Sequence, residues 1–167
     1  MRAHDLTPLP IRPATSAADV AQARALFEEY SAGLGVDLCF QGFAEELAAL
    51  PGAYAPPRGC LLLAGPPDAA VACVALRPLP NADARDARVG EVKRLYVRPE
   101  ARGGALGERL VRMLLDFARA AGYRELKLDT LAEMSAARRL YERLGFGACS
   151  PYYRNPLAGV VYMSRRL

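Results

Sequence analysis

Apolar residues recur at helical spacing in the N-terminal part of the chain. Ser16 and Asp19 have the spacing of a capping box, and the apolar positions after them form one buried helical face. Gly33 and Gly35 are expected to end that helix, because glycine readily adopts the backbone angles of a helix stop. A shorter helix is predicted over residues 43–50.

The C-terminal half carries two further helical patterns. Residues 105–121 place an apolar stripe opposite a charged face, and Gly122 is a natural end for that helix. Ser135 is expected to cap a last helix, which Gly145 ends.

Short apolar runs between turn residues predict the strands. They lie over residues 9–12, 61–64, 70–76, 89–97, 125–129, 146–149 and 160–165. The run over residues 89–97 is the clearest, and a regular pleat would divide its side chains between two faces. One face then carries Val89, Glu91, Lys93, Leu95 and Val97, and the other carries Val92, Arg94 and Tyr96.

The resulting order, βααβββαβαββ, predicts an α/β (α+β) arrangement around one mixed sheet. A chain of 167 residues has the length of one ordinary domain, so residues 1–167 are read as a single domain. Residues 1–8 are expected to be a flexible leader, and residues 81–88 a polar loop.

Composition narrows the class of protein. Apolar residues make up 52% and charged residues 24%, which is typical of a globular chain, and no apolar run reaches the roughly 18 residues of a membrane span. The net charge of +4 comes from arginines scattered over several segments, which disfavours nucleic-acid binding.

The cysteines indicate a reducing compartment. They show no C-x-x-C spacing and follow no secretory signal, so reduced thiols in the cytoplasm and core positions are expected. The cysteines are Cys39, Cys60, Cys73 and Cys149. The sole histidine, His4, lies in the expected leader, and no carboxylate or histidine cluster has metal-ligand spacing, so neither a covalent mechanism nor a metal is expected.

A glycine-rich turn over residues 102–107 joins the strand over 89–97 to the helix that follows. The first N–H groups of a helix lack partners and carry partial positive charge, so such a turn lets a pyrophosphate approach them, with Arg102 adding a charged contact. A tight turn without a ligand explains the glycines equally well. A Walker A loop is excluded because Gly-Lys-Ser/Thr is absent, and a Rossmann fingerprint would sit on the first strand.

Two ordered motifs resemble the GNAT acetyltransferases. Residues 95–107, Leu-Tyr-Val-Arg-Pro-Glu-Ala-Arg-Gly-Gly-Ala-Leu-Gly, are similar to the family's motif A, Arg/Gln-x-x-Gly-x-Gly/Ala. Residues 137–146 resemble its later Leu-Tyr-x-x-x-Gly-Phe motif. The resemblance implies the acyl-CoA N-acyltransferase fold, a mostly antiparallel mixed sheet of about six to seven strands flanked by about four helices. It also implies acetyl-CoA as co-substrate and direct transfer to an amine in a ternary complex.

The resemblance further implies which residues hold acetyl-CoA. Backbone groups of one strand would bind the pantetheine arm, and the glycine-rich turn would bind the pyrophosphate. These residues are Leu95, Tyr96, Val97, Arg102, Gly103, Gly104, Ala105, Leu106 and Gly107. Ala105 departs from the usual glycine but is expected to adopt helical angles, and Met134 stands where many relatives have asparagine.

Two catalytic roles follow from the resemblance. Glu91 matches the glutamate that takes the acceptor's proton directly or through water, although a glutamate on a strand can equally be paired with Lys93 or an arginine. Tyr141 matches the tyrosine that protonates the departing thiolate or holds its sulfur, although on its helix face it can equally be a core residue.

The resemblance also implies that the acceptor is bound by residues 30–54 and 151–156, and a small-molecule amine is expected there, with neither nucleic acid nor membrane as partner. The candidate acceptor residues are Tyr30, Phe40, Tyr152, Tyr153 and Arg154. Glu45 and Glu46 would favour a cationic amine, whereas Arg94 and Arg154 would favour an acidic one, so the acceptor's charge stays open. A homodimer is compatible with the resemblance.

Two alternatives remain. A CoA-binding sensor of the same fold would bind the cofactor without turnover, and replacing Glu91 or Tyr141 would leave its function untouched. A basic nucleic-acid or partner-binding module would show strongly salt-dependent oligonucleotide binding.

Overall fold

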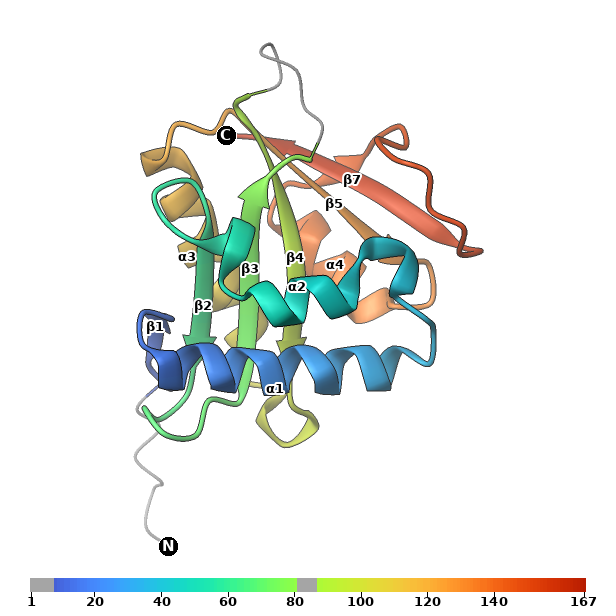
Figure 1. The fold of residues 1–167 in the computed structure, drawn as a ribbon. Helices are drawn as coiled ribbons and strands as arrows, with labels where there is room; N and C mark the ends of the chain where they lie inside the picture. Colours follow the sequence, from blue (N-terminus) through green and yellow to red (C-terminus); the bar gives the residue numbers. More distant parts are fainter. Residues whose placement is uncertain (1–7, 81–86) are drawn as a thin grey trace, which may run out of the picture.

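A computed structural model describes residues 8–80 and 87–167 (Figure 1). Residues 1–7 of the expected leader and 81–86 of the expected loop lie outside this part of the chain. The strands are β1 (Ile11–Pro13), β2 (Cys60–Ala64), β3 (Ala72–Pro78), β4 (Val89–Val97), β5 (Glu125–Leu131), β6 (Gly147–Ala148) and β7 (Val160–Arg166). The helices are α1 (Ala17–Leu34), α2 (Phe43–Ala49), α3 (Leu106–Ala120) and α4 (Ser135–Arg143), with short 3-10 turns η1 (Cys39–Gln41), η2 (Gly52–Tyr54) and η3 (Pro99–Ala101). The predicted order of helices and strands is confirmed.

All the described strands belong to one seven-stranded sheet in the order β1-β2-β3-β4-β5-β7-β6. The central neighbours β4 and β5 run parallel, and the other neighbouring strands pair antiparallel. The predicted mixed, mostly antiparallel sheet is therefore confirmed.

Helices cover both faces of the sheet. Figure 1 shows α1 and α2 crossing one face, while α3 and α4 lie behind the other. On the first face, Phe27 of α1 packs in a buried cluster with Leu63 and Cys73 of the sheet. On the second face, Leu110 of α3 belongs to a larger cluster with Leu126 of β5. These two layers stabilise the sheet by burying apolar surface on both sides.

Local sequence signals explain the ends of most helices. The capping box is present at α1, where the Ser16 hydroxyl accepts from the Asp19 N–H and the Asp19 carboxylate accepts from the Ser16 N–H. Gly35 ends this helix with left-handed angles. Ser135 does not cap α4 as predicted: it is the first helical residue, and Met134 precedes it without a side-chain capping bond.

The pleat of β4 is irregular, which corrects the predicted division of its side chains. The pairing with β3 shifts between Cys73 and Ala75, and Arg94 has a φ of 60°. This bulge places Tyr96 opposite Cys73, on the α1 and α2 side that Lys93 already faces, because one inserted residue reverses the alternation. Leu95 and Val97 pack instead against the cluster on the α3 side.

The prediction that the cysteines lie in the core is right for two of the four. Cys60 and Cys73 are buried, whereas Cys39 is exposed in η1 and Cys149 is half-buried. All four thiols are free. Cys39 was misplaced because it lies in the connection between α1 and α2, which contributes few buried residues.

Candidate functional site

A cavity of about 560 Å³ opens at the point where β4 leads into α3. Its walls come from the end of α1, the end of β4, the glycine-rich turn, the start of α3 and one side of α4. Eight of the nine residues predicted to hold acetyl-CoA are in its lining: Leu95, Tyr96, Val97, Arg102, Gly103, Ala105, Leu106 and Gly107. Gly104 belongs to the same turn but not to this lining. The size suits a ligand considerably larger than a sugar or an amino acid.

The larger cavity runs along the part of β4 that diverges from β5. Their parallel pairing covers Val89, Gly90 and Glu91 opposite residues 125–127 and continues no further in the described chain. Beyond Glu91, the bulge at Arg94 turns β4 away from its neighbour. The edge of β4 at Leu95 is thereby available to a ligand.

The glycine-rich turn has backbone angles that few residues adopt. Ala105 precedes α3 with a φ of 54° and a ψ of 19°, so it is left-handed rather than helical as predicted. A non-glycine residue in this region costs about 1 to 2 kcal/mol. Gly107 is needed for a different reason, since a Cβ there would lie 3.3 Å from Leu140 of α4. The turn therefore brings the N-terminus of α3 close to α4, with its free N–H groups at the cavity.

A smaller cavity of about 50 Å³ lies at the inner end of the larger one. The two cavities share Tyr30, Leu34, Leu95, Met134 and Ala137 in their linings. The smaller cavity adds polar groups from β4, β5, η1 and the β6–β7 loop: Gln41, Lys93, Arg94, Asp129 and Asn155. An acyl group carried to the inner end of the larger cavity would meet these groups.

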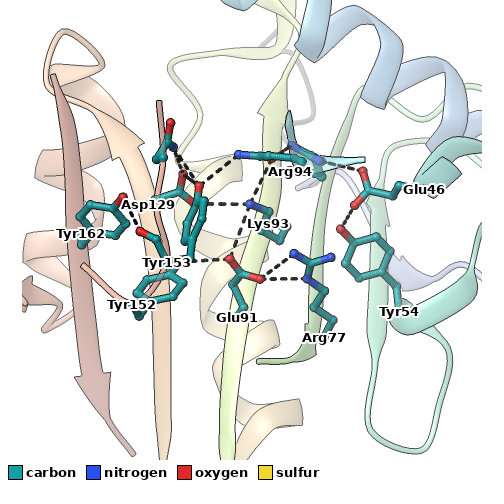
Figure 2. A network of polar contacts seen from close by, with 12 residues as sticks. Glu46, Tyr54, Arg77, Glu91, Lys93, Arg94, Asp129, Tyr152, Tyr153 and Tyr162 are labelled. Carbon is teal, nitrogen blue, oxygen red and sulfur yellow. Dashed lines mark hydrogen bonds and ion pairs between the residues drawn. The ribbon is translucent and has the colours of Figure 1, made fainter. Parts of the chain in front are cut away.

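A row of ion pairs crosses the sheet beside the smaller cavity (Figure 2). Arg77 of β3 contacts Glu91 of β4 at 2.8 Å, and Lys93 lies 3.3 Å from Asp129 of β5 and 3.6 Å from Glu91. The Arg94 guanidinium lies 2.9 Å from the Glu46 carboxylate of α2. Charges this deeply buried need such partners, because an unpaired one would lose its hydration without compensation.

Glu91 lies in the middle of this row. Its side chain is 2% exposed, and it lines neither cavity. Oε2 accepts from Arg77, and Oε1 accepts from the Tyr152 hydroxyl at 3.1 Å. The expected pairing with Lys93 and an arginine is present, and a proton from the cavity can reach Glu91 only through an intermediate group.

Asp129 is the carboxylate that lines the smaller cavity. It accepts from the Tyr153 hydroxyl at 2.6 Å, from Asn155 at 3.2 Å and from Lys93 at 3.3 Å. Burial would raise the pKa of Asp129, but the Lys93 ammonium and these hydrogen bonds outweigh it and lower the pKa below its usual value. Asp129 is therefore held as the anion.

Tyr141 of α4 lines the smaller cavity and is 6% exposed. Its ring packs edge-on against Phe146, with 5.6 Å between the ring centroids. Burial raises the pKa of the Tyr141 phenol, so this group stays protonated. The residue has both features that the sequence left open, a packed ring and a position at the cavity.

The candidate acceptor residues occupy different places. Tyr30 lines both cavities. Tyr152 and Tyr153 lie behind the smaller cavity, where their hydroxyls contact Glu91 and Asp129. Phe40 is 38% exposed, and Arg154 is exposed; neither lines a described cavity.

Sequence reasoning missed Asp129, Gln41 and Arg77 as site residues. Asp129 gave only a weak signal, because it alternates with Leu126 and Leu128 and so falls on the polar face of the predicted strand. Gln41 and Arg77 had none, since they meet the site only through the fold. Within residues 8–80 and 87–167, no group of His, Cys, Asp or Glu side chains has a metal-binding arrangement, and no helix is long and apolar enough to cross a membrane.

Comparisons with known proteins agree with this geometry. The sequence model of the Acetyltransferase (GNAT) family matches residues 22–146. The chain is 40% identical over 146 residues to an uncharacterized N-acetyltransferase of Schizosaccharomyces pombe, covering 87% of this chain and 86% of that protein.

Solved structures share the fold. An acetyltransferase of the GNAT family from Staphylococcus aureus has a TM-score of 0.75 at 15% identity, covering 95% of this chain and 99% of that chain. A Salmonella typhimurium protein solved with its cofactor acetyl-CoA has a TM-score of 0.67 at 20% identity, covering 96% of this chain and 94% of that chain.

Proposed function

Because the chain belongs to the GNAT family of N-acetyltransferases, we propose that it moves the acetyl group of acetyl-CoA directly to the amine of a small-molecule acceptor. The observation that carries the proposal is the larger cavity, which extends from the N-terminus of α3 along the end of β4 and shares Leu95 with the smaller cavity between β4 and β5. This path suits a long ligand with a phosphate end and a reactive end.

The chain's own groups fit the parts of acetyl-CoA. The free N–H groups at the start of α3 and the side chain of Arg102 suit the pyrophosphate. Backbone groups of Leu95, Tyr96 and Val97, at the edge of β4 that leaves β5, suit the amides of the pantetheine arm. Acetyl-CoA supplies the acetyl group as a reactive thioester.

A backbone N–H of β4 beyond the bulge is the proposed donor to the thioester carbonyl. Such a donor stabilises the negative charge that develops on the carbonyl oxygen during acyl transfer, and it needs no rearrangement when the strand already holds it. Tyr141 is the proposed proton donor to the departing thiolate, because its phenol is protonated and lines the smaller cavity.

Glu91 is the proposed acceptor of the amine's proton. A water would carry the proton to it, because Glu91 lies outside the linings of both cavities. Glu91→Gln tests this role while preserving the size of the side chain, although the amide nitrogen cannot accept a hydrogen bond as the carboxylate oxygen did. We expect kcat to fall with unchanged acetyl-CoA affinity. An unchanged kcat would remove Glu91 from the reaction.

Calorimetric titration with acetyl-CoA, with ADP as a control for generic phosphate binding, tests the cofactor assignment. Saturable binding of acetyl-CoA that is clearly tighter than that of ADP is expected. Equal affinities would contradict an acetyl-CoA site. The acceptor reaction is then followed by release of the CoA thiol with a panel of small amines.

The cytoplasm is the proposed location. The four free thiols of Cys39, Cys60, Cys73 and Cys149 suit a reducing compartment. Cell fractionation tests this, and recovery of the protein with secreted material would contradict it.

A further inference from the structure

Two buried cations converge on one neutral oxygen in the smaller cavity. The Oε1 atom of Gln41 accepts from Arg94 Nη1 at 3.1 Å and from Lys93 Nζ at 3.3 Å. The Arg94 and Lys93 side chains are 3% and 5% exposed, and all three residues line the cavity. Figure 2 shows Lys93 and Arg94 side by side on β4.

The bulge in β4 creates this convergence. Lys93 and Arg94 are consecutive, and in a regular strand their side chains would point to opposite faces. The φ of 60° at Arg94 turns its side chain to the same face as that of Lys93, where it meets Glu46 and Gln41. The bulge therefore places two positive charges side by side at the inner cavity.

The contacts of Lys93 are the loosest in the row of ion pairs. Nζ lies 3.3 Å from Asp129 and 3.6 Å from Glu91, whereas the two arginines of the row contact their carboxylates at 2.8 to 2.9 Å. Charge-assisted N–H···O bonds of good geometry are about 2.7 to 2.9 Å long. A carboxylate oxygen in place of the neutral Gln41 amide would make stronger bonds with both cations.

We propose that Lys93 and Arg94 form a carboxylate subsite, and that the acceptor is a small amine of the amino-acid type whose carboxylate displaces the Gln41 side chain. This inference rests on the proposed acetyl transfer. Gln41 belongs to the short η1 turn between α1 and α2 and is itself half-buried, so its side chain can leave without opening the core.

The position and size of the subsite agree with such an acceptor. The subsite shares a cavity with Leu95 and Met134, which also line the larger cavity, so an amine a few atoms from the carboxylate reaches its inner end. The smaller cavity, about 50 Å³, accommodates a group of only a few heavy atoms.

The charges also disfavour the opposite class of acceptor. A second ammonium on the acceptor would face Lys93 and Arg94, which are paired with carboxylates of the row, and Asp129, the carboxylate of this cavity, already accepts from Lys93, Tyr153 and Asn155.

Matched acceptor pairs test the inference. Alanine, leucine and phenylalanine are each compared with the corresponding C-terminal amide, and kcat/KM is measured by release of the CoA thiol. We expect the acids to be preferred by about tenfold or more, which corresponds to one charge-assisted contact. The amides have the more easily deprotonated amine, so this preference opposes their intrinsic advantage.

Two substitutions of Gln41 should affect the preference for acids differently. Gln41→Glu places a fixed carboxylate on Lys93 and Arg94, so the acid-to-amide ratio should fall about tenfold. Gln41→Ala vacates the subsite, so the ratio should stay the same or rise. A purely structural role for Gln41 would change both variants in the same direction.

Three results would overturn the inference: equal or better use of the amides by the wild-type protein, shifts of the same sign in the two variants, or no acetylation of any pair while acetyl-CoA still binds. Calorimetry with acetyl-CoA is run on every variant. Failure of the wild-type protein to bind acetyl-CoA would instead refute the proposed function, so the two failures are distinguishable.

Discussion

Arg94 and Glu46 join the bulge of β4 to α2 through two contacts with a single oxygen. Nε and Nη2 of Arg94 both lie 2.9 Å from Oε2 of Glu46, and the two side chains are 3% and 11% exposed. The guanidinium also lies over the rings of Tyr30 and Phe43, at 5.9 and 5.0 Å from their centroids. These contacts compensate the unfavourable left-handed conformation of Arg94 and connect the helical layer to the inner cavity.

Replacing Glu46 by alanine should cost about 3 kcal/mol of the free energy of unfolding, because it leaves the buried Arg94 guanidinium without its partner. Urea unfolding measures the loss. The neighbouring Glu45→Ala is the control, since Glu45 is exposed on the same helix and its loss should stay within about 0.5 kcal/mol. Equal stabilities of the two variants would show that the pair contributes nothing.

Replacing Gly107 by glutamate should abolish acetyl-CoA binding. A side chain there enters the narrow space between α3 and Leu140 and puts a negative charge beside the helix N-terminus that suits the pyrophosphate. Calorimetry provides the measurement. The same change at Gly147, which is exposed on β6, should leave the affinity unaltered. Wild-type affinity in the Gly107 variant would refute the phosphate site.

Replacing Ala105 by glycine should raise the free energy of unfolding by roughly 0.5 to 1 kcal/mol. Glycine relieves the left-handed strain at this position, although it also adds freedom to the unfolded chain. Thermal or urea unfolding measures the gain. Ala48→Gly, at an exposed position of α2, should lose a similar amount, because its backbone is right-handed helix. A loss at Ala105 would mean that this residue is unstrained.

Tyr141→Phe should lower kcat roughly 100-fold and leave acetyl-CoA affinity nearly unchanged, because it removes the proposed proton donor and keeps the ring that packs on Phe146. Steady-state kinetics and calorimetry separate the two quantities. Tyr123→Phe is the matched control, since Tyr123 is also buried but donates to the Arg58 carbonyl away from both cavities. Similar kcat values in the two variants would leave Tyr141 as a packing residue.

The capping box of α1 should make part of the stability depend on pH. Hydrogen bonds from the Ser16 and Thr15 N–H groups lower the pKa of Asp19 from 3.8 to about 2. A lowered carboxylate pKa means that the stabilisation is fully present above pH 3.8 and is lost as the pH falls toward 2.

Asp19→Asn, which cannot titrate, checks this dependence. Urea unfolding should show the wild-type protein more stable than the variant at neutral pH, with a difference that shrinks below about pH 4. A difference that is constant over this range would mean that the charge of Asp19 contributes nothing to the capping box.

Local patterns in the sequence determined the elements and their order. The α1 capping box and the left-handed end at Gly35 depend on residues a few positions apart, so they are readable without the fold. The glycine-rich turn before α3 was readable for the same reason, and it led to the residues that line the larger cavity. The start of α4 was misjudged by one residue, because Ser135 can occupy either a capping or a first helical position.

The tertiary structure alone decided the inner site. No local pattern marks the bulge at Arg94, since its angles are held by Glu46, Gln41 and the rings of α1 and α2, up to 64 residues away along the chain. The same holds for Glu91, whose partners Arg77 and Tyr152 come from β3 and the β6–β7 loop. The sequence by itself thus determined the helices, the strands, their order and the turn at which the cofactor is proposed to bind, because these follow from neighbouring residues, while the resemblance of two motifs to a family implied the sheet. Which charges face the inner cavity, and which are already paired, depends on contacts between distant segments.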